Sequence, residues 1–196
     1  LEVIQQAQLK GYPLQHIQVL APMYSGLAGI DSLNHAIQKF VNPYDENKRE
    51  LKIGTQIFRE NDKILQLKNQ PNDDVYNGDI GLCIEIIYAR EDELKQNRII
   101  VDFDGRIVEY TSETFININL AYCVSVHKAQ GSEYPIVVIP VVPEHRFMLQ
   151  KRLLYTAVTR ASKSLILIGS KQLFIKGVSE NEDIPRKTCL LEYLIT

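Results

Sequence analysis

Apolar residues recur along the first part of the chain with two spacings, one typical of helices and one typical of buried strands. Residues 2–10 predict a helix, and the apolar run at 17–22 predicts a short buried strand. From Ile30 onward, apolar side chains fall at helical spacing, with Gly29 or Asp31 as the expected cap. A strand, a loop and a helix in this order predict the beginning of an α/β unit.

The middle of the chain, from about 51 to 119, shows only strand signals. The stretch KILQLK alternates, and NGDIGLCIEIIYA predicts a turn followed by a long strand. NRIIVDFDGRIVEY predicts two strands around an Asp-Gly turn, which is a strong hairpin signal. About five short strands within about seventy residues are typical of a small antiparallel barrel of SH3-like or OB-like size.

The α/β pattern returns after residue 120. The runs at 120–126 and 135–142 are apolar throughout, as expected for strands that a parallel sheet buries on both faces. Residues 146–162 predict a helix, and 165–169 predict a further strand. The remainder, with RKTCLLEYL near its end, predicts a short terminal helix.

These patterns together predict a discontinuous domain organisation. Residues 1–50 and 120–196 form an α/β domain, and residues 51–119 form a β-barrel inserted into it. Because the chain leaves the α/β domain and later resumes it, the two ends of the barrel are expected to lie close together.

Composition narrows the class of protein. The 196 residues are 45% hydrophobic, which is ordinary for a globular protein, and the formal net charge of -2 supplies no global basic field. Either the chain does not bind nucleic acid, or it makes few phosphate contacts, or other parts of the molecule supply the charge. The chain shows neither a signal-peptide pattern nor a membrane-spanning run, so we expect a cytoplasmic protein without membrane contact. It does not begin with Met, which suggests a fragment of a longer protein.

The three cysteines argue against a metal site. Cys83, Cys123 and Cys189 are far apart, and no Cys-x-x-Cys pair exists, so neither zinc nor a disulfide framework is predicted. Cys83 and Cys123 lie in apolar runs, where small core residues are expected.

The most distinctive polar segment is SVHKAQGSEY, which joins two apolar runs. Ser125 and His127 alternate at a strand end, so they are expected to point to one side, at the edge where open α/β sheets bind ligands. Gln130 and Gly131 close the turn, and glycine permits a close backbone approach to phosphate. Glu133 suits a ribose hydroxyl or an ordered water. The alternative is a polar surface hairpin that binds nothing.

Two further segments are candidates for phosphate contact. In LLYTAVTRAS, Arg160 shares the polar face of the predicted helix with Arg152 and Thr156, and a guanidinium there suits phosphate clamping. In APMYSGLAGIDSLN, a strand passes through a loop into a helix start, which can bind anions. The alternatives are a solvated surface arginine and an ordinary strand–helix turn. The phosphate-cradling pattern Gly-x-x-x-x-Gly-Lys-Ser/Thr occurs nowhere in the chain.

Taken in order, these segments resemble a known family. QVLAPMYSGLAGIDSLN, AYCVSVHKAQGSEYPIVVI and LLYTAVTRASKSLILIG resemble motifs IV, V and VI of superfamily-one DNA helicases, above all the RecD-like branch. VYNGDIG…VDFDGR, followed by LAYCVSVHKAQGSE, resembles the SH3-like insertion that precedes motif V. The resemblance extends from residue 17 over nearly the whole chain. It implies an α/β fold, namely the second RecA-like motor domain, a parallel-sheet domain of P-loop type without its own P-loop, interrupted by a small SH3-like β-barrel.

The resemblance also implies which residues contact nucleotide. Arg160 matches the motif VI arginine that reaches the γ-phosphate from across the cleft, and such an arginine is worth roughly 10³–10⁵ in rate. The motif V positions that face the nucleotide match Gln130, Gly131 and Glu133.

A second set of positions is implied to contact DNA. Ser125 and His127 match the motif V positions that face the DNA backbone. Met23, Tyr24 and Asn34 match motif IV and are expected near the DNA or the cleft. One turn would then contact both DNA and nucleotide, which would couple the two sites.

The implied partners follow from the family. They are ATP with Mg²⁺, single-stranded DNA and the N-terminal motor domain, which would carry the Walker A lysine and the Mg²⁺ ligands. The family implies translocation in the 5′-to-3′ direction and duplex unwinding. Because the Walker A lysine and the Mg²⁺ ligands would belong to the N-terminal motor domain, we expect this chain alone to hydrolyse no ATP and to unwind no duplex.

Two other functions remain open at the level of sequence. The barrel could recruit a protein partner, with the α/β part as a scaffold. Alternatively, the chain could be a single-strand-binding domain in which bases stack on aromatic side chains of the barrel. These aromatic side chains could instead lie in the barrel core, where they would bind no base. The aromatic candidates are Tyr76, Tyr88, Phe103 and Tyr110.

Overall fold

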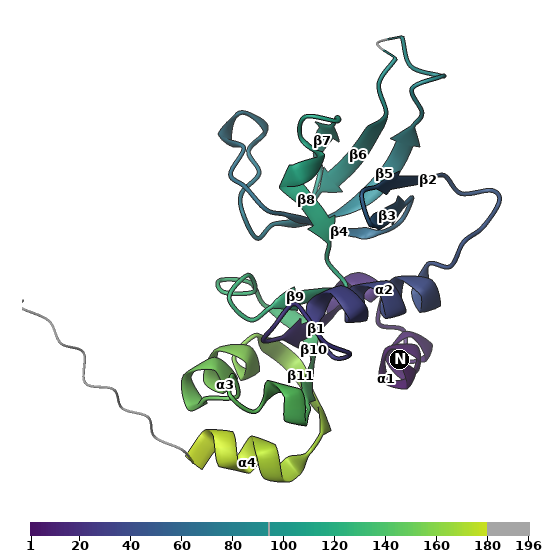
Figure 1. The fold of residues 1–196 in the computed structure, drawn as a ribbon. Coiled ribbons are helices and arrows are strands. Elements are labelled where there is room, and N and C mark those ends of the chain that lie inside the picture. The colour runs from purple at the N-terminus through teal and green to yellow at the C-terminus, as the bar shows by residue number, and fades with distance from the viewer. Residues whose placement is uncertain (94, 180–196) are drawn as a thin grey trace, which may run out of the picture.

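The computed structural model describes residues 1–93 and 95–179, so Cys189 and the RKTCLLEYL segment lie outside the described residues. Figure 1 shows two groups of strands. Strands β1 and β9 to β11 lie with the helices in the lower part, and β2 to β8 lie in the upper part. In the part of the chain that the structure describes, no helix has the length and apolar character that a bilayer span requires.

The lower group is a four-stranded parallel sheet. Its strands are β1 (Ile17–Ala21), β9 (Cys123–Ser125), β10 (Tyr134–Val141) and β11 (Ala161–Gly169). Their order is β11-β10-β1-β9, and each neighbouring pair is parallel. Strands β1 and β9 are buried at every residue, which confirms the prediction of parallel strands covered on both faces.

Helices cover both faces of this sheet. They are α1 (Glu2–Leu9), α2 (Ile30–Val41), α3 (Lys151–Val158) and α4 (Lys171–Ser179). Successive strand residues alternate between the faces. Val19 and Val138 pack in the hydrophobic cluster that includes α1 and α2, whereas Leu20 and Val137 pack in the cluster that includes α3. The result is an α/β fold in which the carboxyl ends of the parallel strands lie along one edge of the sheet.

The upper group is antiparallel, as the middle of the sequence predicts. Its strands are β2 (Glu50–Ile53), β3 (Gln56–Arg59), β4 (Lys63–Gln66), β5 (Ile80–Ile87), β6 (Arg98–Phe103), β7 (Arg106–Tyr110) and β8 (Ile118–Leu120). Five of them form a sheet in the order β7-β6-β5-β4-β8, and β2 pairs with β3 as a separate hairpin. The predicted turn at Asp104 and Gly105 has positive φ at both residues, which suits a tight hairpin.

Four short 3₁₀ helices complete the part of the fold that the structure describes. They are η1 (Leu14–His16), η2 (Pro71–Asp73), η3 (Phe115–Asn117) and η4 (Pro143–His145). Cys83 and Cys123 are fully buried and free, which agrees with their expected role as small core residues.

The predicted strand at 120–126 is wrong in one respect, because the structure divides it between the two sheets. Strand β8 ends at Leu120 beside β4, and β9 begins at Cys123 beside β1. Ala121 and Tyr122 connect them and are buried. The hydrophobic pattern of an apolar run is the same whether the run lies in one core or passes between two cores. The pattern alone therefore could not show the division.

The predicted helix at 146–162 is also wrong in its bounds. Helix α3 spans only Lys151–Val158, and residues 161–169 are all in β11 rather than 165–169 alone. Thr159 and Arg160 form the turn between them. Arg160 is therefore not on a helix face. Its carbonyl accepts the Tyr134 N–H at 2.8 Å, where β10 begins.

Candidate functional site

The motif V segment forms a compact turn directly after β9. Ser125 is buried, and its Oγ accepts the Lys128 N–H at 3.1 Å, so the hydroxyl stabilises the turn. The Ser125 carbonyl also accepts the Ala129 N–H. His127 lies within the turn and is exposed. The strand alternation that was expected to place Ser125 and His127 on one side therefore ends at Ser125.

Gly131 ends the turn in a conformation that other residues rarely adopt. Its φ is +88°, and a Cβ at this position would meet no atom within 4 Å. Glycine is therefore required by the backbone angle rather than by crowding from protein atoms. The open space beside Gly131 leaves room for a ligand. Gln130 and Glu133 flank it, and both are exposed.

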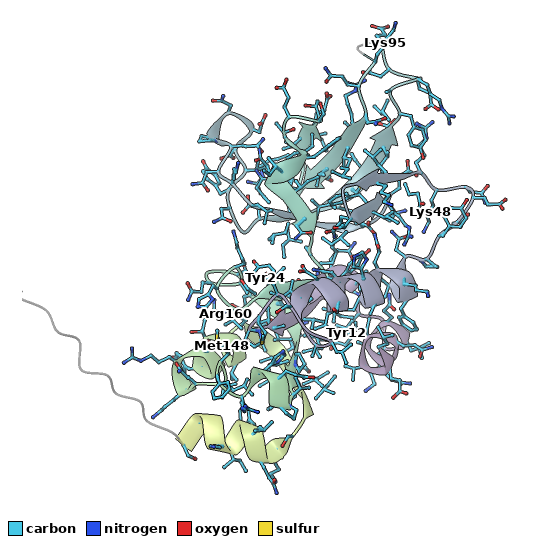
Figure 2. The ribbon with its side chains drawn as sticks, in the orientation of Figure 1. Tyr12, Tyr24, Lys48, Lys95, Met148 and Arg160 are labelled. Carbon is cyan, nitrogen blue, oxygen red and sulfur yellow. The ribbon has the colours of Figure 1, made fainter. Side chains whose placement is uncertain are left out.

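The Arg160 guanidinium lies against this turn and is held by three hydrogen bonds. Its Nη1 donates to the Ser132 carbonyl at 3.0 Å, and its Nε donates to the Thr156 carbonyl at 3.1 Å. Its Nη2 donates to Thr159 Oγ1 at 3.1 Å. The guanidinium is partly exposed, and these three partners are all neutral oxygens. The motif V turn and the motif VI arginine thus converge at one edge of the sheet (Figure 2).

A groove of about 280 Å³ lies between the motif V turn and the start of α3. His127 and Gln130 line one wall, and Arg152 and Thr156 line the other. Its mouth carries Phe147, which is 75% exposed and lies under the Arg146 guanidinium at 4.4 Å. Exposed cationic, amide and aromatic groups within one groove can contact phosphates and bases.

The motif IV loop folds over the start of α2. The carbonyls of Met23 and Tyr24 accept the N–H groups of Ile30 and Asp31 at 3.0 and 3.3 Å. A Cβ at Gly29 would lie 2.4 Å or less from the Tyr24 and Ser25 carbonyl oxygens, so the loop is closed tightly. These N–H groups are already satisfied by the backbone, which argues against the anion site expected at this helix start. The Tyr24 side chain is 50% exposed, and Met23 is partly buried.

Asn34 is not on the surface. It is 2% exposed, its Nδ2 donates to the Cys123 carbonyl at 2.9 Å, and its Oδ1 accepts the Cys123 N–H at 2.8 Å. The side chain holds β9 against α2. The expectation that Asn34 contacts DNA is therefore corrected, because burial and these two bonds leave its amide no free surface.

The four aromatic candidates for base stacking differ in exposure. Phe103 and Tyr110 are fully buried core residues, which rules them out as stacking surfaces. The Arg49 and Arg90 guanidinium groups lie 5.5 and 5.2 Å from the centroid of the Tyr88 ring. The Tyr88 hydroxyl donates to the Glu50 carbonyl. Only Tyr76, which is 45% exposed, offers a substantial free ring among these four.

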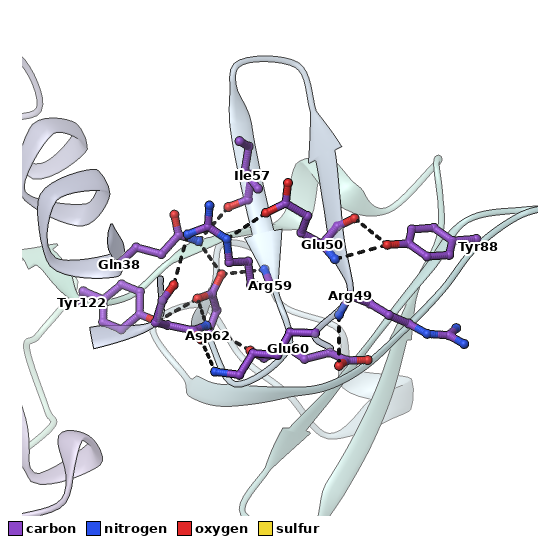
Figure 3. Close-up of polar contacts among 11 residues, drawn as sticks. Gln38, Arg49, Glu50, Ile57, Arg59, Glu60, Asp62, Tyr88 and Tyr122 are labelled. Carbon is purple, nitrogen blue, oxygen red and sulfur yellow. Dashed lines mark hydrogen bonds and ion pairs between the residues drawn. The ribbon is translucent and has the colours of Figure 1, made fainter. Parts of the chain in front are cut away.

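Sequence reasoning missed a buried polar junction between the two groups of strands (Figure 3). Asp62 accepts hydrogen bonds from Gln38 and Asn42 of the α2 region and from the Tyr122 hydroxyl. Burial raises the pKa of Asp62 above its usual value. Lys63 is also buried, and burial lowers its pKa to about 7. The only available signal was two adjacent charges at the start of an apolar strand.

The described residues do not fit a metal site of their own. Nowhere in 1–93 or 95–179 do three or more His, Cys, Asp or Glu side chains gather so that they could hold a metal ion.

Comparison with known families gives two matches in sequence order. Residues 33–103 match the ATP-dependent RecD-like DNA helicase SH3 domain, and residues 120–168 match the UvrD-like helicase C-terminal domain. The second match contains the motif V turn and Arg160. The two domains therefore lie in the order that the motifs predicted.

Individual proteins give the same result. The chain is 35% identical over 176 residues to the ATP-dependent RecD2 DNA helicase of Deinococcus radiodurans, covering 90% of this chain and 23% of the relative. It is 25% identical over 167 residues to the RecBCD enzyme subunit RecD of Buchnera aphidicola subsp. Schizaphis graminum, covering 84% of this chain and 26% of that subunit. The chain thus spans about a quarter of the length of these relatives.

The fold agrees with solved helicase structures. A Pif1 helicase from Bacteroides in complex with ADP-AlF3 and ssDNA superposes with a TM-score of 0.51 at 16% identity, covering 90% of this chain and 44% of that one. The two family matches and the relatives indicate the same family, and the fold is consistent with it. The chain belongs to the RecD-like helicase family, of which it carries the SH3 domain and the C-terminal helicase domain.

Proposed function

We propose that this chain is the second motor domain, with its inserted SH3 domain, of an ATP-dependent DNA helicase that translocates on single-stranded DNA and unwinds duplex. Residues 1–50 and 120–196 would form the motor domain, and residues 51–119 the insert. The observation that carries the proposal is the contact of the Arg160 guanidinium with the motif V turn, at 3.0 Å from the Ser132 carbonyl. Motifs V and VI act together only if they meet at one ligand.

The nucleotide would bind between this edge and an upstream motor domain. Arg160 would turn from its neutral carbonyl partners toward the γ-phosphate, where a guanidinium stabilises the charge that develops during hydrolysis. Gln130, Gly131 and Glu133 would face the nucleotide, and the open space beside Gly131 supports this role. Mg²⁺ would be held by residues outside the described chain and would neutralise phosphate charge.

Single-stranded DNA would pass over the exposed side of the same turn. His127 lines the groove shared with Arg152, and its exposed ring can contact the DNA backbone or stack on a base. Tyr24 has an exposed ring for the same purpose, and the neighbouring Met23 is partly buried. Ser125 would act through the turn that it stabilises. We propose that translocation on the strand runs in the 5′-to-3′ direction, because the family resemblance implies it.

Other partners follow from the relatives. The RecD relative is a subunit of the RecBCD enzyme, and we propose that the SH3 domain of this chain offers a surface to a protein partner. We propose that the protein acts in the cytoplasm.

The test compares the chain with and without its upstream half. DNA-stimulated ATP hydrolysis is expected only in the longer protein. In the longer protein, Arg160→Ala is expected to lower turnover by about 10³-fold or more, since a transition-state charge contact is lost. Arg160→Lys is expected to recover only part of that loss, because an ammonium lacks the planar fork of donors.

The matched control is Lys163→Ala, which removes an exposed cation three residues further along the same segment. Its turnover should equal that of the unchanged protein. Full turnover in Arg160→Ala would remove Arg160 from the mechanism. Protein binding by the short form without any ATPase in the longer form would favour an interaction module, and DNA binding by the short form alone would favour a single-strand-binding domain.

A further inference from the structure

The strand that carries the motif V turn is short and lies at the edge of its sheet. Strand β9 has three residues, and β1 is its only strand neighbour in the described sheet. An edge strand of this length has few ladder hydrogen bonds, so other contacts must fix the direction in which its turn points.

One such contact is made at the beginning of β9. The Tyr122 hydroxyl donates to Asp62 Oδ1 at 2.7 Å, and Asn42 Nδ2 donates to the same oxygen at 2.7 Å. Oδ2 accepts from Gln38 Nε2 at 2.6 Å and from the Arg59 N–H at 2.7 Å. Figure 3 shows this carboxylate between the hairpin of the insert and the motor domain. With all four bonds made in a buried site, Asp62 has one preferred position.

Lys63 makes a second contact at the same end. Its Nζ donates to the Ile17 carbonyl at 3.0 Å and to Gln18 Oε1 at 2.9 Å. Gln18 Nε2 in turn donates to the carbonyls of Ala121 and Tyr122 at 3.0 and 3.3 Å. The Ala121 N–H donates to the Lys63 carbonyl at 2.8 Å. The two residues before β9 are therefore held from both the insert and β1.

The insert also contacts the far end, where the turn lies. Lys128 Nζ donates to Asn77 Oδ1, which belongs to the loop between β4 and β5. In the same loop, a Cβ at Gly78 would lie 3.3 Å from the Lys128 carbonyl oxygen, and Gly78 has φ +105°. Glycine at this position lets the loop approach the turn closely.

We propose that the insert positions the motif V turn, with Asp62, Tyr122 and Asn77 as positioning residues. Asp62 and Tyr122 hold the start of β9, and Asn77 holds the turn that follows it. A load on the insert, from a partner or from DNA, would then change the grip of the turn on its ligands. What the turn binds rests on the proposed function, but the contacts that hold it do not. In this proposal, the insert influences the ligands only through the turn.

The chain offers a closely matched pair of variants for the test. Tyr122→Phe removes the hydroxyl that joins the insert to the start of β9. Tyr110→Phe removes an equally buried hydroxyl, which donates to Gln66 Oε1 at 2.6 Å wholly within the insert. Both changes leave one buried acceptor short of one hydrogen bond, so the test compares exchange of the turn rather than overall stability.

Amide hydrogen exchange in the full-length protein measures the positioning directly. Tyr122→Phe is expected to raise exchange across residues 123–131 by about tenfold, whereas Tyr110→Phe leaves it unchanged. For DNA-stimulated ATPase, Tyr122→Phe is expected to raise the half-saturating DNA concentration by about fivefold and to keep turnover at saturating DNA within about twofold. Equal exchange and equal half-saturation in the two variants would overturn the proposal.

A surface change repeats the test where Tyr122→Phe fails to fold. Asn77→Ala removes the partner of Lys128 on an exposed loop, and Asn72→Ala in the same loop serves as its control. Faster exchange of the turn in Asn77→Ala alone supports positioning, and equal exchange in both overturns it. If the full-length protein shows no DNA-stimulated ATPase, the proposed function fails, while the exchange comparison still decides the positioning role.

Discussion

At the scale of single residues, Asn34 shows how a polar side chain can serve the site without touching a ligand. It binds both the N–H and the carbonyl of Cys123, as a neighbouring strand would. Strand β9 lies at the sheet edge, and Asn34 satisfies the backbone of its first residue from the side of α2. A motif residue can therefore be essential because it satisfies buried backbone groups.

Asn34→Ala is expected to lower the free energy of unfolding by about 2–3 kcal/mol, because it removes two buried hydrogen bonds and their acceptor and donor. Chemical denaturation followed by circular dichroism measures the change. Asn47→Ala, at an exposed asparagine that bonds only to Asp45 among the contacts described, should stay within about 0.5 kcal/mol of the unchanged chain. Equal stabilities for the two variants would contradict the structural role of Asn34.

Arg160 illustrates a different point at the same scale. Its residue type and its sequence neighbours identified it, whereas its position in the turn after α3 emerged only from the fold. Three neutral oxygens hold the guanidinium in place, so it is ordered and yet not neutralised by the described carboxylates. Such a cation keeps its full attraction for phosphate.

At the scale of elements, β4 connects the two halves of the molecule. Every residue of β4 is buried, because one side faces the core of the insert and the other faces the parallel sheet. Ile64 packs in the cluster that includes the insert strands, and Leu65 packs in the cluster on the α3 side. Lys63 begins this strand and is completely enclosed.

The burial of Lys63 makes stability depend on pH. Its pKa falls from 10.5 to about 7 on folding. Between these values the unfolded chain binds more protons than the folded chain, so the free energy of unfolding rises as pH rises from about 7 toward 10.5. Below pH 7 both states carry the proton, and this contribution stays constant at its least favourable value.

Lys63→Met is expected to abolish that rise, whose slope is at most about 1.4 kcal/mol per pH unit. Urea denaturation at pH 7, 8 and 9 measures it. Lys52→Met, at an exposed lysine of β2, should keep the slope of the unchanged chain. The same slope in Lys63→Met and the unchanged chain would show that Lys63 is not the titrating group.

At the scale of the whole molecule, one hydrophobic core runs through both groups of strands. A single cluster contains Ile17 and Ile37 of the α/β part together with Phe58 and Ile86 of the antiparallel strands. The buried polar junction at Asp62 also joins the two groups of strands, through its hydrogen bonds to Gln38 and Tyr122. Continuous packing of this kind favours one cooperative unfolding transition rather than two.

Ile86→Ala, in the core of the insert, is expected to lower the free energy of unfolding by about 2–5 kcal/mol and to shift the protection of β6 and β10 together. Native-state hydrogen exchange at increasing denaturant follows both strands. Ile107→Ala, at an isoleucine that is 58% exposed on β7, is the matched control and should have little effect. Loss of protection in β6 alone would mean that the insert unfolds independently.

The amino-acid sequence by itself determined the two kinds of secondary structure, the interruption of an α/β pattern by short strands, and the turn and arginine of the candidate site. These features depend on local periodicity and on residue types within a few positions, which the chain displays directly. Only the tertiary structure decided that Arg160 meets Ser132, that Asn34 and Lys63 are buried, and that 120–126 passes from one sheet to the other. Those outcomes depend on packing between residues far apart in the chain, and burial, unlike period, has no local signature.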